Sequence, residues 1–226
     1  MLWVYARFPR MEPTATEYEG LRERKKRQTR AAIAAAAMRL FRERGFDAVT
    51  IADVARAADV SEKTIFNYFP AKEDLVFGAG GARRAAIVEA IRERAPGESF
   101  VAPFRAATHA FLDRVERDPV DETVAIPRLV AGSTALRNRL FLGWEEESAV
   151  LGPVLAEEAS EPADDLAPVV VARALAWTHR LTFRAAFTRL LAGEDQRTVA
   201  ADLRTQADRA YDLLEAGLAA YGVRQG

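Results

Sequence analysis

The segment TIADVARAADVSEKTIFNYFPAKEDL, Thr50 to Leu75, constrains the fold of this chain more than any other. Thr50 and Ser61 are residue types that cap helix N-termini, and each is followed by a short stretch of helical periodicity. The second stretch ends before Pro70, because the residue that precedes a proline is disfavoured in helical geometry. Two helices this short, joined by so small a turn, must cross steeply. The segment is therefore typical of a helix-turn-helix.

The second of these short helices has an apolar side and a polar side. The side chains expected to pack inward are Val60, Ile65, Phe66 and Phe69. Those expected to face outward are Glu62, Lys63, Thr64, Asn67 and Tyr68. Hydroxyls, an amide and a lysine on a projecting helix suit the major groove of DNA, where they can bond base edges and phosphates. In the turn, Asp59 stands where a left-handed backbone is expected, and aspartate tolerates that conformation better than most residues.

A basic run, RERKKRQTR, opens a longer helix that we place at about residues 24 to 44, with Gly45 as its C-terminal cap. From Leu21 to Arg84 there are 14 Lys and Arg against 8 Asp and Glu, a net charge of +6. From Asp121 to Pro168 there are 3 Lys and Arg against 10 Asp and Glu, a net charge of −7. This asymmetry favours a polyanionic partner for the first part only, although the basic run alone also fits a solvated helix start.

The Thr50 to Leu75 segment, together with the preceding helix and Gly45-Phe46, resembles the DNA-binding signature of the TetR family of bacterial transcriptional repressors, over roughly residues 24 to 80. The resemblance implies an all-α homodimer, in which a helix-turn-helix domain precedes a variable helical domain. That second domain would bind a small-molecule inducer and so lower the affinity for operator DNA. Asp59 replaces the usual glycine of the turn. Phe66 stands where tyrosine is common, so one hydroxyl that touches phosphate in such proteins is missing here.

Carried over residue by residue, the resemblance points to seven DNA-contacting residues. Thr50 would contact a phosphate, Ser61 would cap the second helix and bond the DNA backbone, and Tyr68 and Lys72 would grip phosphates. The residues nearest the bases would be Lys63, Thr64 and Asn67. Singly, each residue also fits a structural role, as a cap, a solvated charge or a first-turn residue. Jointly, on a projecting helix beside a basic stretch, they favour contact with double-stranded DNA.

We expect three parts in the chain: a flexible tail over residues 1–20, the DNA-binding domain over 21–70, and a helical ligand-binding and dimerisation domain over 71–226. Met11 is an alternative natural start. Breaks at proline, glycine and acidic residues predict helices near 71–94, 98–117, 121–131, 134–158, 166–192 and 196–221. Prolines at 103, 127 and 153 are expected to kink or split the helices that contain them.

The last two predicted helices carry more apolar surface than one packing face needs. Over residues 166–192, one stripe holds Val170, Ala174, Trp177 and Leu181, and a second holds Ala176, Phe183, Phe187 and Leu190. One stripe can cover its own domain while the other meets a second copy. The residues we assign to the dimer interface are Phe187, Leu190, Leu203 and Leu214. A single larger monomeric core is the alternative.

Aromatic residues of the second domain supply surface for a ligand pocket, and the candidates are Phe104, Phe111, Trp144, Trp177 and Phe183. Polar groups for such a pocket are His109, Arg128, His179 and Arg180. All of these also fit ordinary core or surface positions. Arginines near Trp177 are compatible with a carboxylate or phosphate on the ligand. Gly78, Gly80 and Gly81 either form a hinge in the helix near 71–94 or mark a later start or a loop.

Several function classes are disfavoured by what the sequence lacks. With no cysteine and two histidines far apart, neither a metal site nor a bound cofactor is expected. No phosphate loop, nucleophile elbow or HExxH pattern is present, so we do not expect an enzyme. The opening MLWVYARFPR is interrupted by Arg7 and Pro9, which disfavours a signal peptide or membrane span and favours a cytoplasmic protein. A ligand-binding or interaction protein with a vestigial helix-turn-helix remains the alternative, ahead of an enzyme.

Overall fold

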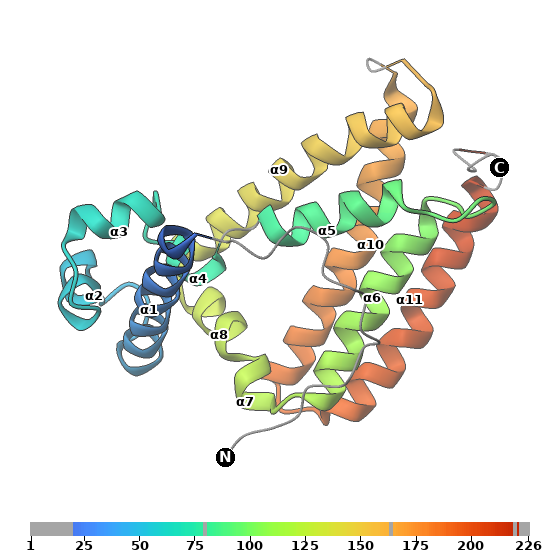
Figure 1. The fold of residues 1–226 in the computed structure, drawn as a ribbon. Coiled ribbons are helices and arrows are strands. Elements are labelled where there is room, and N and C mark those ends of the chain that lie inside the picture. Colours follow the sequence, from blue (N-terminus) through green and yellow to red (C-terminus); the bar gives the residue numbers. More distant parts are fainter. Residues whose placement is uncertain (1–19, 79–80, 163–164, 219–220, 222–226) are drawn as a thin grey trace.

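The structure, a computed structural model, describes residues 20–78, 81–162, 165–218 and 221, so nearly all of the predicted tail lies outside the described residues. Within these ranges every regular element is a helix, which confirms the all-α prediction. The chain forms a small N-terminal group of helices, the head, joined to a larger group, the body (Figure 1). The head holds α1 (Leu21–Arg44), α2 (Ile51–Ala57), α3 (Glu62–Tyr68) and α4 (Asp74–Phe77). The body holds α5 (Gly81–Arg92), α6 (Val101–Arg117), α7 (Val120–Thr123), α8 (Ala125–Gly132), α9 (Thr134–Ala159), α10 (Leu166–Leu191) and α11 (Gln196–Leu218).

The head folds around one apolar cluster, in which Phe41 of α1, Ile65 of α3 and Phe69 after α3 are essentially inaccessible to solvent. The α1 helix ends at Gly45, whose φ of 81° is readily adopted only by glycine and lets the chain turn back. The α2 and α3 helices lie on the side of the head that is away from the body (Figure 1). This arrangement leaves the outer face of α3 open to a partner.

The core of the head continues past the helix-turn-helix into the body. Its apolar cluster includes Leu75 of α4, Leu129 of α8 and Leu136 of α9. Two polar contacts close the same junction. Ser133 Oγ donates to Asp47 Oδ1 at 2.8 Å, and Arg139 Nε donates to an Asp74 carboxylate oxygen at 3.3 Å. A boundary at residue 70 therefore separates the chain by sequence motif and not by core.

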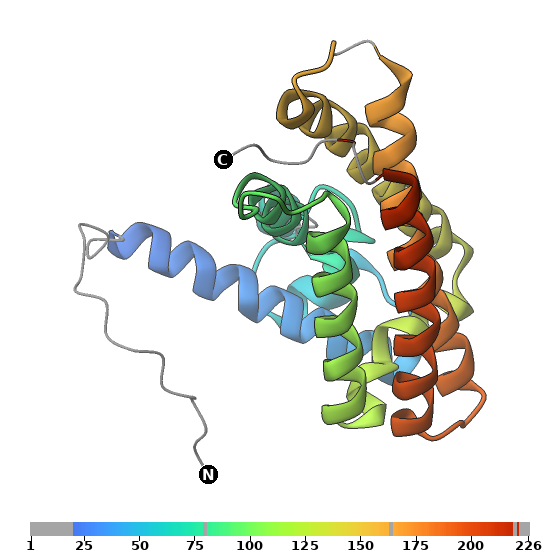
Figure 2. The same ribbon diagram turned by 90° about the vertical axis from the view of Figure 1, so that its right-hand side faces the viewer.

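In the body, α6, α10 and α11 run side by side, and α9 packs across α10 (Figures 1 and 2). The α5 helix packs against α6 and α9. One apolar cluster of the body joins α5, α6, α9, α10 and α11, and a second lies where α6, α10 and α11 approach α7. No helix among the described residues is long and apolar enough to span a membrane.

Most predicted helices are present, with three differences. The helix predicted near 71–94 is two helices, because Gly78 caps α4 with a φ of 64°. The break at Gly78 favours a loop over a hinge within one continuous helix. Gly80 lies outside the described residues. The helix predicted near 121–131 is split at Val124 into α7 and α8. By contrast, α9 continues past Pro153 as one helix, so of the kink or split expected there the split does not occur.

Candidate DNA interface and ligand pocket

The α2 helix starts on a reciprocal capping box. Thr50 Oγ1 accepts the Asp53 N–H at 3.1 Å, and the Thr50 N–H donates to Asp53 Oδ2 at 3.0 Å. The Thr50 hydroxyl also donates to Asp53 at 2.8 Å. These bonds hold the pKa of Asp53 below its usual range, and the bond from the Thr50 backbone has the largest effect. Thr50 is exposed, as a phosphate contact requires, but its hydroxyl proton is already given to Asp53.

The turn and both ends of α3 are held by local contacts. Asp59 adopts a φ of 52°, as predicted for the turn. Ser61 caps α3 by accepting the Thr64 N–H at 3.1 Å, and the two hydroxyls lie 2.8 Å apart. At the other end, Arg30 of α1 donates to the Tyr68 carbonyl at 2.5 Å. The α3 helix is thus fixed to α1 before any DNA is bound, so little ordering cost remains for recognition.

The outer face of α3 presents Lys63, Asn67 and Phe66 to solvent. Lys63 and Asn67 are exposed as predicted, whereas Thr64 and Tyr68 are half-buried, with Tyr68 packed on the head's core. Phe66 was expected to pack inward, but 49% of it is exposed. A helix this short has room for only one buried row, which Ile65 and Phe69 occupy. An exposed phenyl ring is suited to a thymine methyl group, so sequence reasoning missed one candidate here.

Lys72 is placed differently from a free phosphate-gripping lysine. Its Nζ donates to the Phe46 carbonyl at 2.7 Å and lies 4.2 Å from the centre of the Phe46 ring. Burial lowers the pKa of Lys72, and the charges of Asp47 and Glu73 partly oppose this. Lys72 therefore braces the loop after α1. Because an ammonium has three donors, a phosphate contact remains compatible with that bond.

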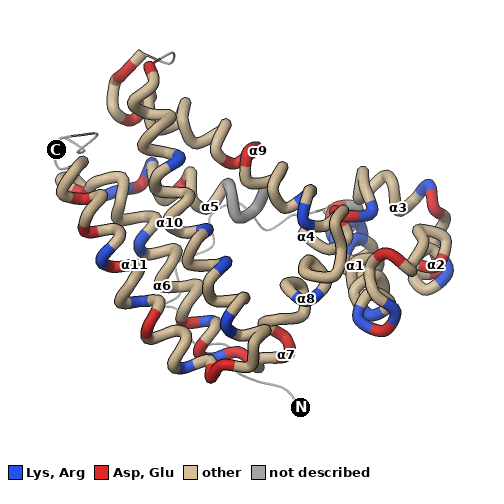
Figure 3. The backbone as a smooth tube through the Cα atoms, turned by 180° about the vertical axis from the view of Figure 1, so that it is seen from behind, with Lys and Arg blue, Asp and Glu red and all other residues tan. Residues whose placement is uncertain are grey.

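The charge of the head is concentrated on α1. The exposed residues Arg24, Lys25, Lys26 and Arg27 follow one another in its first turns. In Figure 3, Lys and Arg mark α1 and points close to α2 and α3, with Asp and Glu interspersed. A basic helix beside the exposed face of α3 is suited to attract the DNA backbone.

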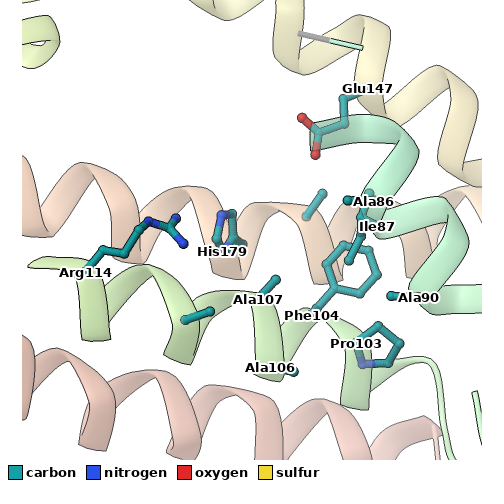
Figure 4. Close-up of a pocket in the computed structure, with 12 residues that line it drawn as sticks. Ala86, Ile87, Ala90, Pro103, Phe104, Ala106, Ala107, Arg114, Glu147 and His179 are labelled. Atoms are coloured by element: carbon teal, nitrogen blue, oxygen red, sulfur yellow. The ribbon is translucent and has the colours of Figure 1, made fainter. Parts of the chain in front are cut away.

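A pocket of about 410 Å³ opens in the body between α5, α6, α9 and α10. Much of its wall is alanine, together with Ile87, Pro103 and Phe104 (Figure 4). The charged or titratable residues that line it are Arg114, Glu147 and His179. We call this the alanine pocket. It is within the size range of small-molecule sites and has their usual composition of apolar walls with few polar groups.

A second cavity, the junction chamber, has a volume of about 530 Å³ and lies where the head meets the body. Val76 and Phe77 of the head line one part of it, and Thr123 of α7 and residues of α8, α9 and α10 line the rest. Between the chamber and the alanine pocket is a space of about 10 Å³, bounded by Trp144, Glu147, His179, Arg180 and Phe183. This constriction has room for about one water molecule.

The five aromatic pocket candidates are divided among three environments. Phe104 lines the alanine pocket, and Trp144 and Phe183 line both the junction chamber and the constriction. Phe111 is buried in a cluster with Phe183 and lines none of these cavities. Trp177 also lines none of them and is 36% exposed. Arg114 and Glu147 were missed, because a single charged residue on a helix has no pattern that separates a pocket from solvent.

Among the residues that the structure describes, no group of three His, Cys, Asp or Glu side chains is arranged to hold a metal ion. The Glu145 to Glu147 run illustrates why. Glu145 pairs with Arg173 at 3.2 Å and Glu146 with Arg139 at 3.5 Å, while Glu147 lines the alanine pocket. Neighbouring helical positions point in different directions and do not converge on one ion.

Comparison with known proteins agrees with the head's geometry. A family model described as bacterial regulatory proteins of the tetR family matches residues 33–79. The transcriptional regulator TcmR of Streptomyces glaucescens, of the helix-turn-helix type, is 30% identical over 151 residues, which span 65% of this chain and 67% of TcmR. The chain belongs to the TetR family. It is a DNA-binding transcriptional regulator.

Solved structures show that the similarity in fold extends over the body of this TetR-family chain. NalD of Pseudomonas aeruginosa, a secondary repressor of an efflux pump, has a TM-score of 0.54 at 19% identity, covering 81% of this chain and 97% of NalD. SmeT in its complex with triclosan has a TM-score of 0.55 at 18% identity, covering 88% and 93%. A TetR-family regulator of Streptomyces coelicolor A3 has a TM-score of 0.51 at 23% identity, covering 85% and 99%. At these identities the likeness shows the fold alone.

The two apolar stripes of α10 lie the other way round from the expectation. Leu190 and Leu203 are each 4% exposed, so these two have little surface left for a partner. Phe187 and Leu214 are partly buried against the body's clusters, and their place in an interface stays a prediction. The exposed stripe contains Val170, Trp177 and Leu181, at 62%, 36% and 54%. The correction has a simple cause: α6 and α11 cover the side of α10 that carries Leu190.

Proposed function

We propose that this TetR-family regulator is a repressor that binds operator DNA as a homodimer and is released by a small molecule bound in the alanine pocket. The observation that carries the proposal is the outer face of α3, where Lys63, Phe66 and Asn67 are exposed on a helix already fixed by Arg30 and Ser61. Such a helix can enter a major groove without rearrangement. NalD, which has the same fold, is itself described as a repressor.

Within this proposal, Asn67 and Lys63 contact base edges, with Thr64 and Phe66 beside them. Thr50, Ser61, Tyr68 and Lys72 serve the phosphate backbone. The hydroxyl bonds within the Thr50–Asp53 and Ser61–Thr64 pairs indicate that Thr50 and Ser61 act first as helix caps. Their contribution to DNA is then through the backbone N–H groups and the position of the helices.

The homodimer is proposed to form on the exposed α10 stripe of Val170, Trp177 and Leu181. Exposed apolar side chains along one helix mark a candidate interaction surface, and a partner's α10 would cover them. Two heads held by one interface can engage two successive major grooves, which a single head cannot. A protein that acts on operator DNA would work in the cytoplasm, as a binding protein and not as an enzyme.

The alanine pocket is proposed as the inducer site because α5 forms one of its walls and follows directly on α4 of the head. A ligand that contacts Ala86, Ile87 and Ala90 on one side and α6 on the other fixes the position of α5. It can favour the head spacing that does not fit DNA only by binding that state more tightly. That SmeT has been solved with triclosan supports a small-molecule site in a protein of this fold.

The test is selection of bound fragments from random double-stranded DNA with the purified chain, followed by titration of the selected sequence. We expect one enriched sequence with two related half-sites. Asn67→Ala should change its base preference, and Arg209→Ala, on exposed α11 far from the head, should change nothing. Binding that is equal for selected and random DNA would overturn the proposal and favour a helix-turn-helix without a DNA role. Turnover of a substrate by the purified chain would favour an enzyme.

A further inference from the structure

The alanine pocket has unusually smooth walls. Two facing helices contribute short side chains, from α5 at Ala86 and Ala90 and from α6 at Ala106, Ala107 and Ala110, and α10 adds Ala176. Alanine has no side-chain rotamers, so these walls can neither fold away from a bulky ligand nor reach toward a thin one. Phe104 and Pro103 close the pocket with rigid rings. The walls are therefore suited to a rigid, flat apolar body.

One end of the pocket is defined by a chain of hydrogen bonds. The Tyr211 hydroxyl lies 2.8 Å from Thr108 Oγ1, which lies 2.8 Å from His179 Nδ1. Tyr211 and Thr108 are both fully buried, and burial raises the pKa of Tyr211 to about 12, so its hydroxyl keeps its proton. Thr108 is the hydrogen-bond partner that the structure gives this hydroxyl. The Tyr211 O–H must therefore donate to Thr108, because a buried hydroxyl proton without an acceptor is costly.

This direction fixes the tautomer of His179. Since Thr108 accepts from Tyr211, its own proton is given to Nδ1 of His179, which must accept it. A neutral His179 then carries its proton on Nε2, and the ring is a hydrogen-bond donor at that nitrogen. His179 is part of the lining of the alanine pocket. The buried relay from α11 thus places the proton of a neutral His179 on Nε2.

Arg114 adds a positive charge at the same end. Its side chain and His179 project toward one another from α6 and α10, whereas Glu147 lies toward α5 in Figure 4. Most arginines of the body that the structure describes are held by carboxylates, as Arg105 is by Asp212 at 2.8 Å. In the described part of the chain, Arg114 has no carboxylate at ion-pair distance. Its guanidinium is therefore available for an acidic group within the pocket.

We propose that the alanine pocket binds a flat aromatic molecule whose anionic oxygen group, of the carboxylate kind, is held by Arg114 at the end of the pocket that His179 also lines. The aromatic body lies between the alanine walls, and any donor at its far end faces Glu147. This deepens the proposed function and rests on it for the meaning of binding, but its chemistry is tested without DNA.

The experiment uses the full chain and two fluorescent probes of one shape, anthracene carboxylate and its uncharged amide. Pentadecanoate, with the same number of carbons in a flexible chain, serves as a competitor. We expect the carboxylate to bind about tenfold more tightly than the amide, the ratio typical of one charge-assisted contact. Pentadecanoate should displace it poorly. Equal affinity for carboxylate and amide, or ready displacement by pentadecanoate, would overturn the proposal.

Variants locate the binding. Arg114→Gln should remove the carboxylate preference and leave amide binding unchanged, whereas Arg209→Gln on the outside of α11 should alter neither. Ala107→Trp, which fills the pocket, should abolish binding of both probes. Circular dichroism confirms that each variant is folded. Carboxylate binding that survives Ala107→Trp, or an Arg114→Gln variant that keeps the preference, would place the probe elsewhere and refute the assignment.

Imidazole nitrogen NMR provides a second, independent measurement. The chain has two histidines, so His109→Gln leaves the signals of His179 alone. We expect the tautomer protonated on Nε2, and the opposite tautomer would contradict the relay. The outcomes separate the two proposals. Charge-selective probe binding without any selected DNA site would refute the repressor and leave this inference standing. A selected DNA site without charge-selective probe binding would refute this inference and leave the repressor standing.

Discussion

Replacing Lys72 by methionine distinguishes a brace from a phosphate contact. A lysine that only grips DNA would be dispensable for folding. In the structure, however, Lys72 Nζ donates to the Phe46 carbonyl at 2.7 Å and lies over the Phe46 ring, which itself contacts Phe41 with ring centres 5.0 Å apart. Lys72→Met keeps an unbranched apolar stem of similar length and removes only the ammonium group.

The expected loss of stability follows from those two contacts. A hydrogen bond from a charged donor contributes about 1.5 to 3 kcal/mol, and a cation over an aromatic face adds about 0.5 to 1 kcal/mol. The methionine side chain recovers part of this, because burial lowers the pKa of Lys72 and so disfavours its charged form. We therefore expect the free energy of unfolding to fall by about 1 to 2 kcal/mol.

Urea denaturation measures this loss, and Lys63→Met is the matched control. Lys63 is exposed on α3, so its replacement should change stability by less than about 0.5 kcal/mol while weakening DNA binding. If Lys72 also touches a phosphate, Lys72→Met should reduce the salt dependence of DNA binding by about one unit of slope. Unchanged stability of Lys72→Met would refute the bracing role of Lys72. An unchanged salt slope would show that Lys72 has the bracing role alone and does not contact a phosphate.

Three further predictions concern the other surfaces. Asn67→Ala should change the preference at one base pair by about 1 to 3 kcal/mol, as measured by titration with operator variants, and a uniform loss on all sequences would place Asn67 on the backbone instead. Trp177→Glu should give monomers in sedimentation and Val120→Glu, on α7, should not; a dimeric Trp177→Glu variant would move the interface away from α10. Burial holds the pKa of Tyr211 at about 12, so the folded chain keeps a proton that the unfolded chain gives up from about pH 10. The free energy of unfolding should fall by about 2 kcal/mol between pH 10 and 12 beyond that of Tyr211→Phe, and parallel pH profiles would contradict this.

Local signals allowed much of the head to be predicted from the sequence. Thr50 and Ser61 cap α2 and α3 as expected, Gly45 ends α1, and Asp59 takes the left-handed turn conformation. Each of these features is decided within a few residues, by a side-chain oxygen that reaches a nearby N–H or by a backbone angle that few residues adopt. Such features depend little on how the rest of the chain packs.

The sequence did not predict which of two similar surfaces would be buried. Periodicity shows that α10 has two apolar stripes but not which one α6 and α11 cover. Leu190, which was expected at the interface, is therefore buried, and Trp177 is exposed. Phe66 looked inward because it is apolar, although Ile65 and Phe69 already fill the buried row. The proposed role of Arg114 had no sequence signal, because it depends on how α6 and α10 face each other in space.

The continuation of the head's core into the body bears on how such regulators can be recombined. Exchange of DNA-reading modules between relatives, in evolution or in the laboratory, requires a cut at some point after the helix-turn-helix. Here a cut at residue 70 would separate Phe69 and Ile65 from Leu75, Leu129 and Leu136, and would part Asp47 from Ser133. A chimaera that keeps its specificity and its stability must therefore carry α4 and the α8–α9 corner along with the head, even though these lie far along the chain.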